Sequence, residues 1–198
     1  MQFRELKNYS DFKMPQQDTL VQWYAMSATY RSELKIKEYL DGKQVESFIP
    51  LVTGFRVINR RRVKTQVPAV SNLIFVHCTK KRIDELKISQ PRLQYKMMPD
   101  GLSRRYVTIP DAEMQNFINA CTLAKEKKNF LDPSTIDFDA LNIKSGDKVR
   151  ICCDNGSVVE GTLVAVQGRR KKKVVIGAAQ LMYVTLDQDS ANYTIEKL

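Results

Sequence analysis

Five side chains in this 198-residue chain have the chemistry of a nucleophile or a metal ligand: one histidine and four cysteines. His77 precedes Cys78, and neighbouring residues on a strand point to opposite faces, so these two cannot form a nucleophilic pair. Cys121, Cys152 and Cys153 lack the C-x-x-C spacing of a metal site. A pairing in space of His77 with Cys121 or Cys152 is the only basis for an enzyme, and no glycine-rich phosphate loop or paired acidic motif supports it. We therefore expect a non-enzyme with free thiols and with neither cofactor nor metal.

Basic residues are the second chemical signal. The chain has 32 Lys and Arg residues against 22 Asp and Glu, a net charge of +10. Residues 1–125 carry 21 basic and 12 acidic side chains, residues 126–139 carry 2 and 4, and residues 140–198 carry 9 and 6. Most of the charge thus lies in the first 125 residues and predicts a polyanionic partner. With no apolar run of membrane length and no secretory signal, we expect a cytoplasmic protein that does not bind membranes.

Strand and helix patterns alternate along the first 125 residues. In the last helix, Asp111 is the expected N-cap, and a covered stripe is expected at Met114, Phe117, Ile118 and Cys121. One sheet with helices packed on it is an α+β sandwich. The expected strands are at 20–30, 47–58, 63–67 and 73–78, and the expected helices at 32–42, 81–89 and from 111 onwards.

The remainder of the chain is expected to be all-β. An Asn-Gly turn at 155–156 separates two alternating runs, and closing the strands into a small barrel would remove exposed edges. The predicted organisation is a polar leader at 1–18, a domain at 19–125, a linker at 126–139 and a barrel domain at 140–198. The expected barrel strands are at 148–153, 158–166, 173–176, 181–186 and 193–195.

Four short motifs occur in order along these elements, and together they resemble the NusG-type transcription elongation factors. The motifs are Trp23-Tyr24-Ala25-Met26, Phe48-Ile49-Pro50, the run 68–76 (P-A-V-S-N-L-I-F-V), and Gly146-Asp147-Lys148-Val149-Arg150 with Gly161. The resemblance implies an N-terminal α/β sandwich with an antiparallel sheet, followed by a small SH3-like KOW β-barrel. The KOW residues would be Gly146, Asp147, Val149 and Gly161.

The long leader and a degenerate KOW motif are similar to the UpxY branch of this family, which is associated with capsular polysaccharide loci. The family's G-P-F in the KOW loop is replaced by Asn155-Gly156-Ser157, which leaves contacts with ribosomal protein S10 or Rho open. The resemblance implies a monomeric antiterminator that binds RNA polymerase at a dedicated operon. A ribosome- or rRNA-binding KOW protein is the alternative, but it would spread its basic residues over both domains.

The resemblance also implies site residues. The positions that match those facing the polymerase clamp helices are Leu73, Phe75, Met114 and Phe117, although helical spacing alone favours a core role for such residues. Arg31, Lys35 and Arg92 match places that face non-template DNA. Arg60, Arg61 and Arg62 at a hairpin tip could reach upstream DNA or nascent RNA, and the basic turn at 169–173 is either solvated or bound to RNA.

Overall fold

A computed structural model describes residues 19–124, 129–131, 147–153, 156–164, 173–178, 181–187 and 193–198. The predicted leader, the KOW residue Gly146, residue Asn155 of the predicted turn and residues 169–172 of the basic turn lie outside this part. Within it, no helix is both long and apolar enough to span a membrane.

The first sheet is built around strand β1 (Val21–Ala28), whose middle residues are all buried. This burial on both faces follows from its sequence, which is apolar or aromatic at nearly every position. β1 pairs antiparallel with β5 (Ile74–Thr79) on one side and with β6 (Leu93–Tyr95) and β9 (Thr108–Ile109) on the other. The short strand β2 (Glu46–Phe48) extends the sheet beyond β5. The predicted antiparallel sheet is confirmed, but β6 and β9 were not expected.

Helices α1 (Glu33–Gly42) and α2 (Lys80–Ser89) cover one face of this sheet. Ile36 and Leu40 of α1 share a fully buried cluster with Ile83 of α2 and with alternate residues of β1 and β5. The helical spacing at 36 and 40 puts both side chains on one face, as the sequence predicted. Arg31, Lys35 and Glu38 are exposed.

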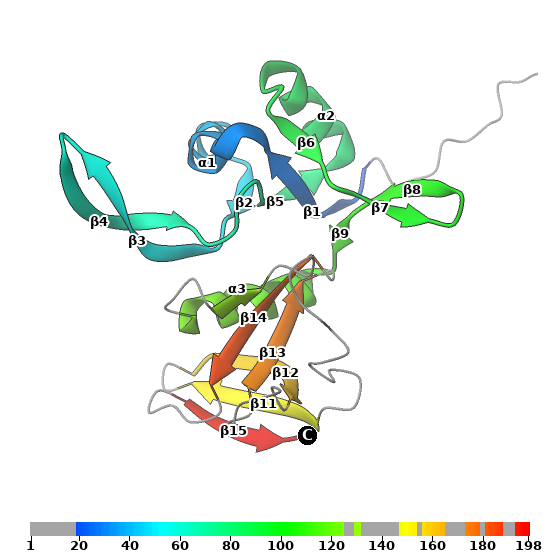
Figure 1. The fold of residues 1–198 in the computed structure, drawn as a ribbon. Helices are drawn as coiled ribbons and strands as arrows, with labels where there is room; N and C mark the ends of the chain where they lie inside the picture. The colour runs from blue at the N-terminus through cyan, green and yellow to red at the C-terminus, as the bar shows by residue number, and fades with distance from the viewer. Residues whose placement is uncertain are drawn as a thin grey trace, which may run out of the picture.

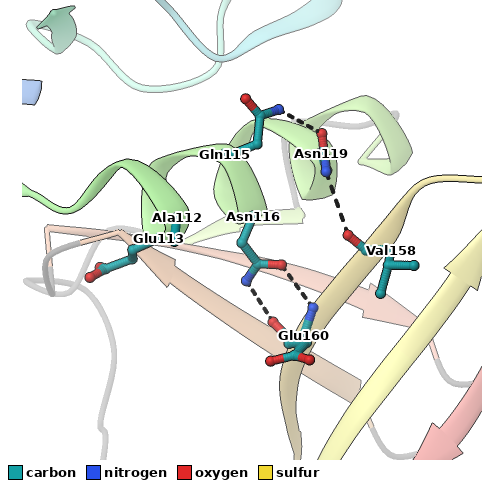
Figure 2. Close-up of a pocket in the computed structure, with 7 residues that line it drawn as sticks. All are labelled: Ala112, Glu113, Gln115, Asn116, Asn119, Val158 and Glu160. Carbon is teal, nitrogen blue, oxygen red and sulfur yellow. Dashed lines mark hydrogen bonds between the residues drawn. The ribbon is translucent and has the colours of Figure 1, made fainter.

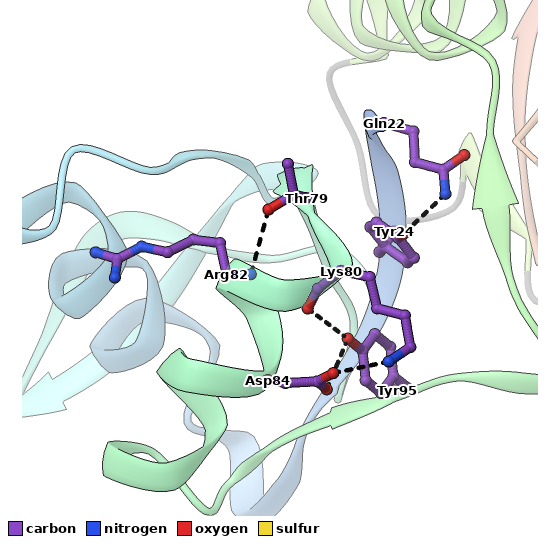
Figure 3. Close-up of polar contacts among 7 residues, drawn as sticks. All are labelled: Gln22, Tyr24, Thr79, Lys80, Arg82, Asp84 and Tyr95. Atoms are coloured by element: carbon purple, nitrogen blue, oxygen red, sulfur yellow. Dashed lines mark hydrogen bonds and ion pairs between the residues drawn. The ribbon is translucent and has the colours of Figure 1, made fainter. Parts of the chain in front are cut away.

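Polar contacts fix α2 against the sheet (Figure 3). The Thr79 hydroxyl caps the helix by accepting from the Arg82 amide at 3.2 Å. The Tyr95 hydroxyl donates to Asp84 at 3.1 Å, and Lys80 lies 2.8 Å from the other oxygen of that carboxylate. Burial alone would raise the pKa of Asp84, but the hydrogen bonds from Lys80 and Tyr95 outweigh it and lower the pKa. The neighbouring Tyr24 hydroxyl accepts from Gln22 at 2.7 Å.

Two hairpins extend from this domain (Figure 1). The first joins β3 (Leu51–Ile58) and β4 (Arg61–Pro68) through a turn at Asn59 and Arg60, both in the left-handed region. It confirms the predicted basic hairpin. The second joins β7 (Met97–Asp100) and β8 (Ser103–Tyr106) through Gly101, and no pattern in the sequence predicts it.

Helix α3 (Asp111–Leu123) lies on the opposite face of the sheet from α1 and α2. Asp111 is the first helical residue and makes no cap; the N-cap is Pro110, so the predicted capping role is wrong. In the predicted stripe, Met114 and Phe117 are buried, while Ile118 and Cys121 are only partly buried against the same cluster. Ala120 is fully buried as well, so the covered part of the helix is wider than one stripe.

The second sheet has the strand order β10-β14-β13-β12-β11-β15. Val149, Ile151 and Cys153 alternate inward on β11, as predicted. The end strands β10 and β15 are not paired with each other among the described strands, so a closed barrel stays a prediction. The strands are β10 (Phe130–Leu131), β11 (Asp147–Cys153), β12 (Val158–Val164), β13 (Lys173–Ala178), β14 (Met182–Asp187) and β15 (Tyr193–Lys197).

Strand β10 comes from the segment that was predicted to be a linker. It pairs with β14, and the buried Asn129 beside it donates to the Thr185 carbonyl at 2.8 Å. The Thr185 hydroxyl donates back to the Asn129 carbonyl at 3.3 Å. The described residues of this segment are therefore part of the second sheet.

We expect Gly161→Ala to destabilise the second domain. A Cβ at Gly161 would lie 2.6 Å from Val174 Cγ1 and 3.0 Å from the Val175 carbonyl oxygen, and backbone cannot move aside cheaply. Such overpacking typically costs about 1–3 kcal/mol, measured as a lower urea midpoint. Gly42→Ala is the matched control, because nothing lies within 4 Å of its Cβ position, and it should be neutral or stabilising. Equal effects of the two variants would contradict this packing.

Candidate functional site

Helix α3 is buried from two sides, one toward each sheet (Figure 1). Phe117 packs edge-on against Phe75 of β5 and Phe48 of β2, with ring centroids 5.8 and 6.4 Å away. Asn116 and Asn119 instead contact β12 of the second sheet. A single apolar cluster therefore runs from the first sheet through α3 into the second sheet.

Two asparagine side chains make the polar part of the contact between α3 and the second sheet, as Figure 2 shows. Asn116 donates through Nδ2 to the Glu160 carbonyl and accepts through Oδ1 from the Glu160 amide, both at 2.8 Å. Asn119 Nδ2 lies 3.5 Å from the Val158 carbonyl oxygen. On β12, the residues paired with β13 begin at Thr162, so Glu160 lies outside this ladder. The Asn116 side-chain amide bonds the backbone groups of Glu160 in place of a neighbouring strand.

An open groove follows this contact. Its volume is about 580 Å³, and Figure 2 shows its lining residues on α3 and β12. Glu160 at its edge is also paired with Arg150 at 3.0 Å. The groove lining is Ala112, Glu113, Gln115, Asn116, Asn119, Val158 and Glu160.

The four residues predicted to bind the polymerase are all in the cluster that runs through α3. Leu73, Phe75, Met114 and Phe117 are each at most 2% exposed. The structure thus brings the four together on one side of the sheet. In this arrangement they are buried and do not form an exposed patch, so their role in binding stays a prediction.

His77 is on the same face as this cluster. Its ring stacks on Trp23, with centroids 4.8 Å apart, and Nδ1 lies 2.7 Å from the Glu46 carboxylate. Nε2 lies 3.4 Å from Asp111 at the start of α3. Cys78 packs in the opposite cluster, so the predicted separation of His77 from Cys78 is confirmed. The surroundings of His77 are those of a residue that positions α3 and β2.

The predicted nucleic-acid residues Arg31 and Arg92 lie close together at one end of the first sheet. Three loops meet there: the Thr29 amide donates to the Arg92 carbonyl at 3.0 Å, and the Arg31 amide donates to Asn72 Oδ1 at 3.2 Å. Lys35 is exposed one turn into α1. Arg31, Lys35 and Arg92 make no ion pair with any described residue.

Arg60, Arg61 and Arg62 are exposed at the tip of the β3–β4 hairpin. The Arg62 guanidinium lies 4.8 Å from the centroid of Phe55, a ring that is 60% exposed. The hairpin thus offers cations beside an exposed aromatic ring, a combination that suits a nucleic acid.

The described KOW residues have structural roles. Val149 is buried, and Gly161 is in close contact with β13. Asp147 pairs with Lys197 of β15 at 2.9 Å.

The four cysteines are free thiols. Burial raises the pKa of the Cys78 thiol to about 11, an effect that Arg82 only partly offsets. Burial also raises the pKa of Cys121. Since the thiolate is the nucleophile, neither group is activated for catalysis. Among the described residues, no group of three or more His, Cys, Asp and Glu could hold a metal ion.

The sequence does not predict two features of these surfaces. Polar residues between apolar ones on a helix are typical of a solvated face, so the pattern does not indicate the contacts of Asn116 and Asn119. The strand expected at 20–30 includes Tyr30, yet this residue is 86% exposed with φ of 59°. No local signal in the sequence marks either feature, because each depends on residues distant along the chain.

Comparisons with known proteins agree with part of this picture. Residues 21–118 match the protein family described as transcription termination factor nusG. No curated protein matches the chain. A solved structure described as "Domain interaction in Thermotoga maritima NusG" is similar, with 18% identity and a TM-score of 0.40, covering 90% of this chain and 93% of that chain.

The raised pKa of Cys78 predicts its reactivity. Alkylation of Cys78 by iodoacetamide should keep accelerating between pH 9 and about 11, because burial keeps the thiol protonated in that range. Peptide mass spectrometry would measure the rate, with the urea-unfolded chain as the control. The free energy of unfolding should fall over the same window, since the unfolded chain releases this proton nearer pH 9. A folded-state rate that levels off at pH 9 would contradict the burial.

Proposed function

We propose that the chain is a transcription antitermination factor, because residues 21–118 match the family described as transcription termination factor nusG. The chain binds the clamp helices of RNA polymerase through its N-terminal domain and suppresses pausing and termination. It acts in the cytoplasm, as a monomer, at a dedicated operon such as a capsular polysaccharide locus of the UpxY kind. Its second domain is a KOW barrel, for which ribosomal protein S10 is a candidate partner.

The observation that carries this proposal is the apolar cluster that runs through α3. Among the described residues, the Asn116 and Asn119 side chains add hydrogen bonds between that helix and the second sheet. Binding a pair of helices requires an apolar surface with a polar rim. Separation of the second domain from α3 would expose such a surface, with Asn116 and Asn119 at its edge.

The polymerase-binding residues of the proposal are Leu73, Phe75, Met114 and Phe117. They lie at or under this surface, and all are buried while the second domain is docked. Phe117 contacts Phe75 and Phe48, so part of its role is to hold α3 on the sheet. We infer that these residues shape the face that the polymerase contacts, and that docking and polymerase binding compete.

Nucleic acid is the second partner of the proposal. Arg31, Lys35 and Arg92 face non-template DNA, and Arg60, Arg61 and Arg62 reach upstream DNA or nascent RNA. Exposed cations of this kind bind phosphate and give a salt-dependent affinity. No catalytic group is required for any of these actions.

Transcription in vitro with the cognate RNA polymerase tests the function. On a template with the target leader and a terminator, the chain should raise read-through and co-elute with polymerase. Unchanged read-through together with no co-elution would overturn the proposal, and binding to ribosomes instead would favour the rRNA-binding alternative.

The polymerase face has a test that separates contact from stability. Met114→Ala should weaken polymerase binding beyond any loss of fold, because Met114 belongs to the cluster next to that face. Leu40→Ala is the matched control: Leu40 is equally buried, but in the cluster on the far side of the sheet. Each change costs about 2–5 kcal/mol of stability. Equal losses of polymerase affinity in the two variants would assign Met114 to the core alone.

Competition between docking and binding predicts the behaviour of Asn116→Ala. This change removes two hydrogen bonds to Glu160 and should weaken docking by about 1–3 kcal/mol. Hydrogen exchange at Val158 and Glu160 should speed up, and polymerase affinity should rise. Glu38→Ala, at an exposed position of α1 away from the contact between α3 and β12, should change neither quantity. Faster exchange with lower polymerase affinity would show that the docked form is the binding form.

A further inference from the structure

Tyr30 is an exposed aromatic side chain on a backbone that aromatic residues seldom adopt. Its ring is 86% exposed, and its φ of 59° is in the left-handed region. Arg31, the next residue, has φ of 52°. Left-handed conformations of bulky residues cost of order 1–3 kcal/mol and persist only where the surroundings impose them. Since the ring packs into neither apolar cluster, ring burial does not offset this cost.

The surroundings impose this conformation through hydrogen bonds from three loops. Glu33, only 2% exposed, accepts from the Asn72 amide at 2.5 Å through Oε1. Asn72 in turn accepts from the Arg31 amide at 3.2 Å, and the Ser32 hydroxyl donates to the Thr29 carbonyl at 2.6 Å. A buried carboxylate thus fixes the turn that presents Tyr30 to solvent.

Positive charge surrounds the ring. The Arg92 guanidinium lies 5.9 Å from the ring centroid, within cation–π range, and the Thr29 amide ties the loop of Arg92 to that of Tyr30 at 3.0 Å. Arg31 is adjacent in sequence. An exposed ring with one guanidinium group beside it and a second arginine next to it in the chain can stack a base while the cations bind the flanking phosphates.

We propose that Tyr30 is the stacking platform for an unpaired base of a single-stranded nucleic acid. The proposal rests on the proposed function in one respect, that the same loop cluster contacts nucleic acid. It adds the ring, and with it a requirement for an unpaired base, because bases within a duplex already stack on each other. Arg31 and Arg92 supply the phosphate contacts on either side.

Fluorescence of 2-aminopurine tests the stacking directly. The full chain is titrated into single-stranded oligonucleotides, DNA and RNA, with one 2-aminopurine, and into the matching duplexes, while anisotropy of an end label gives the affinity. We expect quenching of 2-aminopurine by the single strands only. Tyr30→Ala should abolish the quenching and weaken binding roughly 5- to 150-fold, with the salt dependence unchanged. Tyr30→Phe should retain both quenching and affinity.

Two further variants separate stacking from charge. Arg92→Gln should weaken binding and reduce the slope of log affinity against log salt by about 0.7. Leu102→Ala, a change to an exposed apolar side chain on the β7–β8 hairpin, is the control and should change nothing. Circular dichroism should show that every variant is folded, since none of these side chains is buried.

The outcomes distinguish this inference from the function on which it rests. Loss of affinity in Arg92→Gln with no change in Tyr30→Ala would overturn the stacking role and keep the basic surface. No change in either variant would overturn both the stacking role and nucleic-acid binding at this cluster, while polymerase co-elution remains a separate measurement. Equal binding of duplex and single strand would also overturn the stacking role.

Discussion

The position of α3 between two sheets is the constraint on which the rest of the structure depends. The buried residues of the helix cover an arc too wide for one surface. Met114 and Phe117 are buried, and Ala120, which lies further around the helix circumference, is buried as well. A helix with one apolar stripe needs one partner, whereas this helix needs two. The second domain supplies the second partner, and the same arrangement removes this apolar surface of α3 from solvent.

Hydrogen bonds contribute to the contact between α3 and the second sheet. Asn116 satisfies both backbone groups of Glu160, which would otherwise meet water at an incomplete strand edge. Water can replace such amide contacts at little cost when the surfaces separate. On the other face of the first sheet, α1 and α2 are held by apolar packing, with α2 further fixed through Asp84 and Tyr95. The contact of α3 with the second sheet is also packed with apolar side chains, and the Asn116 hydrogen bonds add to it.

The sequence was sufficient to predict the elements whose signals are local. The alternation at Val149, Ile151 and Cys153, the dense apolar run of β1 and the spacing of Ile36 and Leu40 all report burial directly. The strands β6 to β9 were missed because 93–109 mixes Arg, Pro and Met without a clear period. Asp111 was misassigned because Pro110 satisfies the cap position by its fixed backbone angle and needs no side chain. Neither the roles of Asn116 and Asn119 nor the turn at Tyr30 could be predicted, because the contacts join residues that are distant in sequence. Asn116 lies 44 residues from Glu160, Asn119 lies 39 residues from Val158, and Asn72 lies 41 residues from Arg31.

The short connection between α3 and β10 determines how tightly a partner must bind α3 to displace the second domain. Residues 124–129 are all that separate Leu123, the end of α3, from Phe130, the start of β10. A short tether keeps two surfaces at an effective concentration on the order of millimolar. A free partner at micromolar concentration must therefore bind α3 about a thousandfold more tightly than the tethered domain does to displace it. A partner that also contacts other surfaces of the chain gains the additional affinity that this demand requires.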